Sequence, residues 1–321
     1  MPAKKKELLT VFVTGATGRL GRYLIKALTE NGDTVRALSI NKEEVRKLFP
    51  GAIPFVGNLT DIHVLDDACN GADVVIHLAA VVGEAGARTE DLIRSNVEGT
   101  KNILEACKKN NIKHLIFTSA VEVYGRKRNV PLDEKSTLLP SDRYGYSKML
   151  AEQAVINSHV PYTILRIAKI YGIGFGHAFF KIFRALKEGR MAIVGNGNNH
   201  LALIHINDVI NAMMLVINNP DVCKNEIYNL TDGENYTQEH LMEIGAELLG
   251  VSKPRVHMRE FVLRMLARQR NLDSDELRFL TSDRIIKIDK IKKELKFRPS
   301  IDLHTGGKEL INAFLSGAKE N

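Results

Sequence analysis

The chain has 321 residues, 44% of them hydrophobic and 26% charged, so it is long enough to bury a large core. Its net charge of +7 arises from cations interleaved with acids, and no basic-aromatic pattern indicates a nucleic-acid partner. No stretch approaches the roughly 18 apolar residues of a membrane-spanning helix, and the three scattered cysteines lack metal-ligand spacing. We expect a cytoplasmic protein with reduced thiols, no integral membrane segment and no metal site.

A glycine-rich turn follows the first apolar, β-rich run at residues 8–13 and leads into a helical pattern at 23–28. Strand, glycine turn and helix in this order form the phosphate-binding start of a nucleotide fold, because glycine permits the tight turn and the helix N-terminus adds partial positive charge. An ordinary tight turn is the alternative. We expect the cofactor to contact Gly15, Thr17, Gly18, Arg19, Leu20 and Gly21.

The second predicted strand, residues 34–39, should end beside the adenosine ribose of a dinucleotide. An acidic residue there favours NAD, whereas a cation favours the 2′-phosphate of NADP. This chain instead has Ser39, Ile40, Asn41 and Lys42, and it carries Arg19 in the glycine turn. The cofactor is therefore NAD or NADP, with a slight preference for NADP. Merely solvated Lys42 and Arg19 side chains are the alternative.

Strands and helices alternate through the first half of the chain. A short strand at 52–56 precedes Asn58 and Leu59, and a continuous apolar run at 72–80 fits a parallel strand covered on both faces. Within that run we expect His77 to be a core histidine. A helix over 91–108 and a strand over 113–119 follow. The alternation predicts an α/β protein with a doubly wound, Rossmann-like parallel sheet.

Tyr144 and Lys148 open a predicted helix and lie four residues apart, so they share one helix face. A free phenol has a pKa near 10 and is a poor base at neutral pH. A lysine ammonium within about 4–6 Å favours the phenolate, which suits acid/base work on a carbonyl or alcohol. We expect Lys148 to lower the pKa of Tyr144. Tyr146 has the wrong spacing for this part.

With these motifs the chain resembles the extended short-chain dehydrogenase/reductases, the group of NAD(P)-dependent epimerases/dehydratases and 3β-hydroxysteroid dehydrogenases. The matching segments cover nearly the whole chain: 15–21, 75–80, 96–100, 123–125, 144 with 148, 165–172, 195–197, 205–209 and 294–299. The resemblance implies that Tyr144 is the acid/base, that Lys148 also holds the nicotinamide ribose, and that the protein is a homodimer. It further assigns cofactor contacts to Ser39, Asn41, Asn58, Leu59, Leu78, Ala79, Ala80, Asn96, Ile167 and Ile170.

The chain departs from the family pattern at several positions. A Ser or Thr should stand four residues before Tyr124, but Ala120 is there; neighbouring Ser119 or Thr118 could replace the hydroxyl, and Ser119 is our catalytic candidate. Such a donor is typically worth about 10²–10³ in rate. Leu201 stands where nucleotide-sugar epimerases carry a phosphate-clamping Arg, which favours a lipophilic substrate. The alternative is that Leu201 packs in the core while Lys169 or Arg255 binds phosphate.

Long helical patterns dominate the second half. We predict a cofactor-binding domain at 1–172 and a smaller, mainly substrate-binding lobe at 173–321, with a return to the sheet near 203–232 that includes a strand at 227–230. Residues 256–270 read as an amphipathic helix rich in arginine, expected to pack on the lobe with a solvated basic face; contact with a membrane surface is the alternative.

Three functions remain open on this reading. The first is an NAD(P)-dependent oxidoreductase that interconverts a secondary alcohol and a ketone on a small, lipophilic molecule. The second is a nucleotide-sugar epimerase or dehydratase that holds NAD tightly. The third is a cofactor-binding sensor without efficient catalysis, which Ala120 keeps open.

Overall fold

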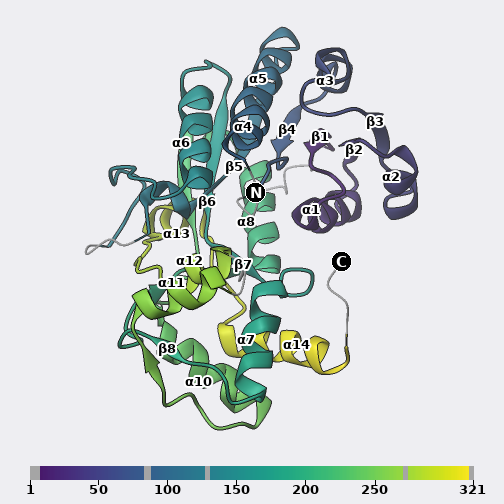
Figure 1. Ribbon diagram of the computed structural model, residues 1–321. Helices are drawn as coiled ribbons and strands as arrows, with labels where there is room; N and C mark the ends of the chain where they lie inside the picture. The colour runs from purple at the N-terminus through teal and green to yellow at the C-terminus, as the bar shows by residue number, and fades with distance from the viewer. Residues whose placement is uncertain (1–7, 83–87, 127–130, 270–273, 318–321) are drawn as a thin grey trace.

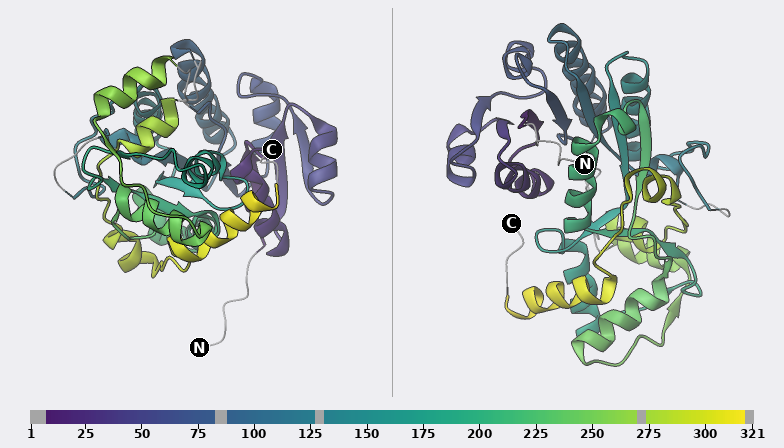
Figure 2. Two further views of the ribbon diagram at one scale, coloured as in Figure 1. Left: turned by 60° about the horizontal axis from the view of Figure 1, so that its bottom comes forward. Right: turned by 180° about the vertical axis from the view of Figure 1, so that it is seen from behind.

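The computed structural model describes residues 8–82, 88–126, 131–269 and 274–317, without the side chains of 266–276 (Figures 1 and 2). A sheet-based part occupies the upper half of Figure 1, and a helical lobe lies below it. Helix α8 (Ile206–Asn218) runs along the sheet-based part toward the lobe.

The sheet has seven strands in the order β11-β6-β5-β4-β1-β2-β3, all paired in parallel. The strand order reverses between β1 and β4, and ligands of such sheets bind at the carboxyl ends beside that switch point. The predicted doubly wound α/β fold, including the returning strand near 227–230, is confirmed. The strands are β1 Thr10–Thr14, β2 Thr34–Ser39, β3 Ile53–Val56, β4 Val74–His77, β5 His114–Ala120, β6 Tyr162–Ile167 and β11 Glu226–Leu230.

Apolar helix faces cover both sides of this sheet, because parallel strands are hydrophobic on both faces. One core cluster joins the sheet to α3 (Ile62–Cys69), α5 (Gly99–Lys109) and α6 (Arg143–Ile156). The opposite cluster joins it to α1 (Arg19–Glu30), α2 (Lys42–Leu48), α8 and α13 (Asp289–Leu295). Cys69, Cys107 and Cys223 are all free and buried, as expected.

The helix expected over 91–108 is less regular than predicted. It consists of α4 (Thr89–Leu92), a π-helical segment η1 (Ile93–Glu98) and then α5. Single π-helical turns recur at functional sites. After β5 the chain forms a short 3₁₀ helix, η2 (Val121–Tyr124), which had not been predicted.

The lobe has its own apolar core beneath α7 (His177–Lys187), α10 (Gln238–Leu249) and α14 (Leu303–Leu315). Residues 286–297, however, pack on the sheet with α13, so this late segment also supports the first domain. None of the described helices combines the length and apolarity needed to cross a membrane. The lobe and its border also contain β7 Lys169–Tyr171, β8 Ile193–Val194, β9 His200–Leu201, β10 Leu203–His205, β12 Tyr236–Thr237, β13 His257–Met258, α11 Glu260–Gln269 and α12 Ser274–Leu280. The short helix α9 Pro220–Cys223 belongs to the sheet-based part, where Cys223 packs in the sheet's core.

The helix predicted over 256–270 begins only at Glu260, because His257 and Met258 pair with β8 as strand β13. Its apolar side is not wholly packed: Phe261 is 75% exposed and Met265 is also exposed. Glu260 accepts from Arg264, so part of the basic face is paired. The predicted features at Leu266, Arg268 and Arg270 lie outside the described side chains.

Candidate active site

The glycine turn brings three backbones into contact at the carboxyl end of β1. A Cβ on Gly21 would lie 2.3 Å from the carbonyl oxygen of Gly15, and one on Gly15, whose φ is +68°, would lie 2.8 Å from the amide nitrogen of Ala79. Gly18 donates its backbone N–H to Gly15. Only glycine permits both the left-handed φ and this approach. The turn, Ala79 and the start of α1 thus form one surface suited to a pyrophosphate.

The end of β2 lies across this turn, as predicted. The Ser39 hydroxyl is 3.5 Å from that of Thr17 and accepts from the backbone N–H of Asn41. Asn41 caps α2 by accepting from Glu44. The Arg19 guanidinium lies 5.8 Å from the centre of the Phe175 ring, in a cation–π contact with the start of the second half. Lys42 is exposed at the start of α2.

His77 is the expected core histidine. Its Nδ1 lies 2.7 Å from the Thr14 hydroxyl and its Nε2 lies 3.0 Å from the Thr100 hydroxyl, which itself donates to the carbonyl of Asn96. Thr100 must therefore accept from a protonated Nε2, leaving Nδ1 to accept from Thr14. Thr14 in turn accepts from the backbone N–H of Ala79. Burial, followed by the nearby Lys148 cation, lowers the pKa of His77 from 6.5 to about 3.

Acid is expected to destabilise the fold through His77. Between pH 6.5 and about 3, His77 is protonated in the unfolded chain but stays neutral in the folded one. The free energy of unfolding therefore falls as the pH drops below 6.5. At pH 5 this effect costs about 2 kcal/mol. Urea unfolding of the parent and His77→Asn at pH 7.5 and pH 5 should show that the variant loses about 2 kcal/mol less between the two pH values. Equal losses would contradict this role.

Asn96 joins the loop after β4 to α6 from within the π-helical segment. Its side-chain nitrogen donates to the Val81 carbonyl and to the Ser147 hydroxyl, both at 2.9 Å, and its oxygen accepts from the Val81 N–H at 2.8 Å. Every polar group of this buried amide is therefore engaged. Asn96 thus links the loop after β4 to helix α6 through its side chain, and this side chain has no free polar group for a ligand.

Tyr144 is the second residue of α6, which Asp142 caps by accepting from the Gly145 N–H at 2.8 Å. A Cβ on Gly145 would lie 2.6 Å from the Glu122 carbonyl, so this helix begins directly on η2. Lys148 follows one turn later, buried, with its ammonium 4.7 Å from the centre of the Phe117 ring.

The prediction that Lys148 lowers the pKa of Tyr144 is wrong for the chain by itself. Burial raises the pKa of the Tyr144 phenol, and the carboxylates of Glu122 and Asp142 raise it further. Burial also lowers the pKa of Lys148 to about 8. The structure thus keeps Tyr144 as a neutral phenol, a proton donor, across physiological pH.

Ser119 differs from its neighbours in having a hydroxyl without a partner. Its residue is 4% exposed, and the oxygen makes no hydrogen bond to any described residue. Alternation along β5 places Ser119 on the same face as Phe117, beneath Lys148, and places Ala120 on the face of Thr118. Thr118 donates to the His77 carbonyl and is already satisfied. Of the two replacements considered, Ser119 is the available donor.

The remaining predicted residues lie along the same carboxyl edge but with different tasks. The side-chain oxygen of Asn58 accepts from Thr60, and Leu59 packs its side chain against Gly99. Leu201 is 1% exposed within the lobe core, as the alternative expected, and this position offers no cation. Leu78 and Ala80 follow the end of β4, Ile167 is the last residue of β6, and Ile170 lies on β7.

Sequence reasoning missed Arg284, which no motif marks. This residue is 8% exposed, and its guanidinium donates to the carbonyls of Val121 and Gly125 at 3.1 and 3.2 Å and to the Glu122 carboxylate at 3.2 Å. Val121 is the first residue of η2, Glu122 is its acidic residue, and Gly125 directly follows it. A residue from the last fifth of the chain therefore holds the turn on which Tyr144 rests.

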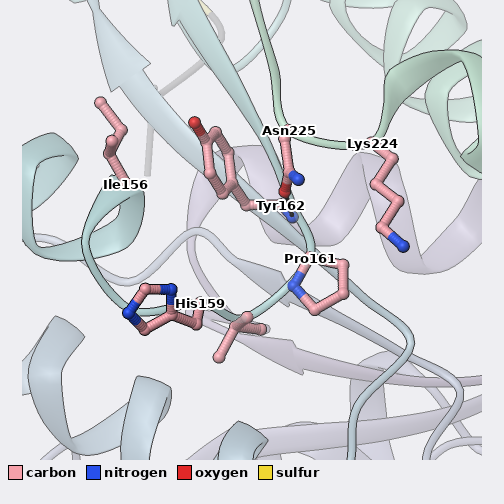
Figure 3. A pocket seen from close by; sticks show the side chains of 7 residues that line it. Ile156, His159, Pro161, Tyr162, Lys224 and Asn225 are labelled. Atoms are coloured by element: carbon pink, nitrogen blue, oxygen red, sulfur yellow. Dashed lines mark hydrogen bonds between the residues drawn. The ribbon is translucent and has the colours of Figure 1, made fainter.

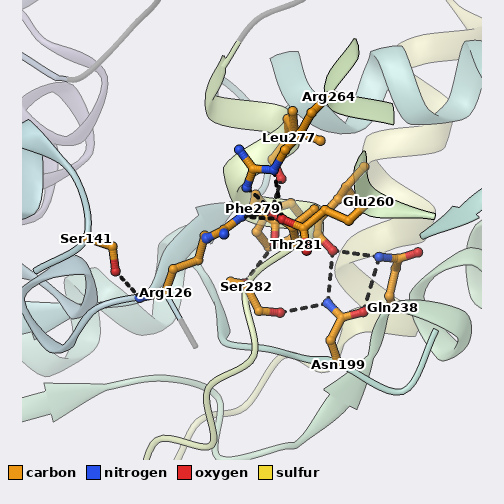
Figure 4. A network of polar contacts seen from close by, with 11 residues as sticks. Arg126, Ser141, Asn199, Gln238, Glu260, Arg264, Leu277, Phe279, Thr281 and Ser282 are labelled. Carbon is orange, nitrogen blue, oxygen red and sulfur yellow. Dashed lines mark hydrogen bonds and ion pairs between the residues drawn. The ribbon is translucent and has the colours of Figure 1, made fainter. Parts of the chain in front are cut away.

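A second contact between the lobe and the η2 region is shown in Figure 4. Arg126 donates to Glu260 of α11 at 2.9 Å and to the Thr281 hydroxyl at 2.6 Å, and its backbone N–H donates to Ser141. Behind this contact, Gln238 and Asn199 both donate to the Leu280 carbonyl. These contacts hold the lobe against the segment that follows η2.

A hollow of about 340 Å³ lies elsewhere on the molecule (Figure 3). Its lining, which includes His159, Tyr162 and Lys224, belongs to the segments that enter β6 and β11. This is the amino end of the sheet, whereas the glycine turn, Ser119 and Tyr144 lie at the carboxyl end. The hollow is therefore separate from the candidate active site.

A dinucleotide-type glycine turn and a Tyr–Lys pair at one edge of a parallel sheet define a nicotinamide-dependent enzyme of the short-chain dehydrogenase/reductase class. The model of the NAD dependent epimerase/dehydratase family matches residues 11–231, and the chain belongs to this family. It is thus an enzyme of the extended branch of that class.

Three known proteins illustrate the breadth of the relatives. The chain is 27% identical, over 77% of its length and 75% of the relative's, to N-acetyl-alpha-D-glucosaminyl-diphospho-ditrans,octacis-undecaprenol 4-epimerase of Escherichia coli O157:H7. It is 26% identical, over 77% and 79%, to a decarboxylating sterol-4-alpha-carboxylate 3-dehydrogenase of Dictyostelium discoideum. The fold matches UDP-glucuronic acid 4-epimerase from Bacillus cereus in complex with NAD, with a TM-score of 0.78, 21% identity and coverage of 97% and 100%.

Proposed function

We propose that the protein is an NAD(P)-dependent oxidoreductase that interconverts a ketone and a secondary alcohol on a small, lipophilic substrate. The observation that carries the proposal is the lack of a guanidinium at position 201, where nucleotide-sugar epimerases resembling this chain hold a phosphate-clamping Arg. Leu201 stands there instead and packs in the lobe core, so it supplies no phosphate contact and does not itself line a substrate site. An apolar group cannot replace a bidentate guanidinium on phosphate oxygens. The two sequence relatives named above act on a polyprenol-linked sugar and on a sterol, which agrees with a lipophilic substrate.

The neutral state of Tyr144 suits it to the proton donor's part in ketone reduction. The bound nicotinamide supplies the hydride, and the carbonyl oxygen must receive a proton as negative charge develops on it. A half-buried phenol with a raised pKa is neutral and can donate that proton. The Ser119 hydroxyl can donate a hydrogen bond to the same oxygen.

The residues of the cofactor site fit a dinucleotide, since Gly15 and Gly21 leave no room for a Cβ in the turn that faces Ala79. The end of β2 carries no acid to accept from a 2′-hydroxyl. Two cations lie in the segments that border it: Arg19 in the glycine turn and Lys42 three residues after Ser39. We therefore propose NADP in preference to NAD. The protein is proposed to act as a homodimer on a small-molecule substrate, with the domain boundary near residue 172.

Replacing Arg19 with Ala is expected to weaken NADPH binding about tenfold and to leave NADH binding nearly unchanged, because one charged contact to the 2′-phosphate is worth roughly 1.5 kcal/mol. Fluorescence titration of both reduced cofactors measures the two affinities. Lys26→Ala is the matched control, since Lys26 lies on the same helix and pairs with Glu30. Tighter binding of NADH than of NADPH by the parent protein would overturn the NADP preference.

The epimerase alternative keeps support from its relatives, which include UDP-glucuronic acid 4-epimerase. The experiment that separates the two functions is mass spectrometry of small molecules released from the denatured protein. Retained NAD beside a nucleotide sugar favours the epimerase. An empty site that accepts NADPH and then reduces sterol-like or prenylated ketones supports the reductase.

A further inference from the structure

Tyr144 rests on a turn whose one acidic side chain works against its ionisation. The helix that carries Tyr144 begins directly on η2, with no space for a Cβ between Gly145 and the Glu122 carbonyl. The Glu122 carboxylate belongs to the same turn, and with Asp142 it is one of the two charged groups that raise the pKa of the phenol. Arg143, directly before Tyr144, and Lys148, one turn later, are the cations on Tyr144's own helix.

Arg284 forms an ion pair with Glu122. Its guanidinium reaches the Glu122 carboxylate at 3.2 Å and also spans the turn by donating to the carbonyls of Val121 and Gly125. One planar group thus contributes a counter-charge and two fixed hydrogen bonds, which a lysine cannot reproduce. With the guanidinium largely excluded from water, its interaction with the carboxylate is screened only weakly.

The backbone around Arg284 is anchored independently of its side chain. Asp283 donates to the carbonyl of Arg126, Leu132 donates to Ile285, and Lys287 donates back to Leu132. We therefore expect the backbone of residues 283–287 to keep its course over the η2 region when the guanidinium is removed. This makes substitution of Arg284 a test of its charge and hydrogen bonds rather than of the course of the chain.

We propose that Arg284 is a positioning residue for Tyr144: it balances the Glu122 carboxylate and holds the turn on which the phenol-bearing helix begins. The proposal rests on the proposed function, in which Tyr144 handles the proton. The carboxylate raises the proton affinity of Tyr144 and the guanidinium moderates it. The pair thus tunes the proton donor without touching the substrate.

The test measures the ionisation of residue 144 directly and needs no substrate. Protein carrying 3-fluorotyrosine, whose phenol is more acidic than that of tyrosine, is titrated by fluorine NMR with saturating NADP⁺, and the resonance of residue 144 is assigned from its absence in Tyr144→Phe. Arg284→Met should raise the midpoint by about one pH unit, equivalent to a tenfold change in proton affinity. Glu122→Gln should lower it, and the double variant should lie near the parent.

Two further variants separate charge from structure. Arg284→Lys keeps the charge and should restore most of the midpoint, although it loses the two-carbonyl contact. Arg36→Met is the matched control, because Arg36 also donates to two carbonyls, those of Ala68 and Asn70, but does so from β2. It should leave the midpoint unchanged.

Identical midpoints in the parent and Arg284→Met overturn the proposal, as does a resonance that stays at its phenol position up to pH 10.5 in all the variants. Failure of the proposed function has a different signature: Tyr144→Phe would retain turnover while the midpoints still moved as expected. The two failures are therefore distinguishable.

Discussion

Tyr144→Phe is expected to lower the rate of NADPH-dependent ketone reduction by about 10²–10⁴, the usual contribution of a positioned general acid. The phenylalanine ring keeps the packing of the half-buried tyrosine but cannot deliver a proton to the developing alkoxide. The affinity for NADPH should change little, because the phosphate cradle lies at the glycine turn. Steady-state kcat and a fluorescence titration of NADPH measure the two effects.

Tyr146→Phe is the matched control for that experiment. Tyr146 lies on the same helix two residues later and is exposed, so removing its hydroxyl should leave kcat within a factor of two or so of the parent. A Tyr144→Phe enzyme that retains more than a tenth of the parental kcat would show that another group supplies the proton. The acid/base assignment would then fail.

Ser119→Ala is expected to reduce kcat by about 10²–10³, the loss typical of removing one hydrogen-bond donor to a developing oxyanion. The reason is the buried hydroxyl without a partner among the described residues, on the face of β5 that carries Phe117 and faces Lys148. Stability should not fall with activity, because no hydrogen bond in the described chain is broken by the substitution.

Two companions make this test specific. Thr118→Val removes a neighbouring hydroxyl that donates to the His77 carbonyl, and it should cost stability more than kcat. Adding Ala120→Ser to Ser119→Ala places a hydroxyl where the family pattern carries one. Alternation sets position 120 on the face of β5 opposite Phe117 and Lys148, so we expect no rescue of activity. Full activity in Ser119→Ala, or complete rescue by the serine at 120, would move the donor away from Ser119. A parent protein that binds cofactor and turns over nothing would favour the sensor function.

Local patterns were sufficient for the architecture. The glycine spacing at 15–21, the apolar run at 72–80 and the alternation of strands with helices each reflect interactions within a few residues or a repeated burial pattern, so they are legible in the chain itself. The pairing of Tyr144 with Lys148 on one face follows from helix geometry alone. The π-helical segment at Asn96 and strand β13 at His257 were missed, because they depend on partners distant in sequence.

The sequence by itself determined the fold class, the family, the edge of the sheet where the site lies and the candidates Tyr144, Lys148 and Ser119. Only the tertiary structure decided their electrostatic state. Burial and the carboxylates of Glu122 and Asp142 raise the pKa of Tyr144 against the expected effect of Lys148, and Arg284 reaches Glu122 from a segment far along the chain. Proton affinity depends on the sum of desolvation and nearby charges in space, and neither quantity is encoded in local spacing.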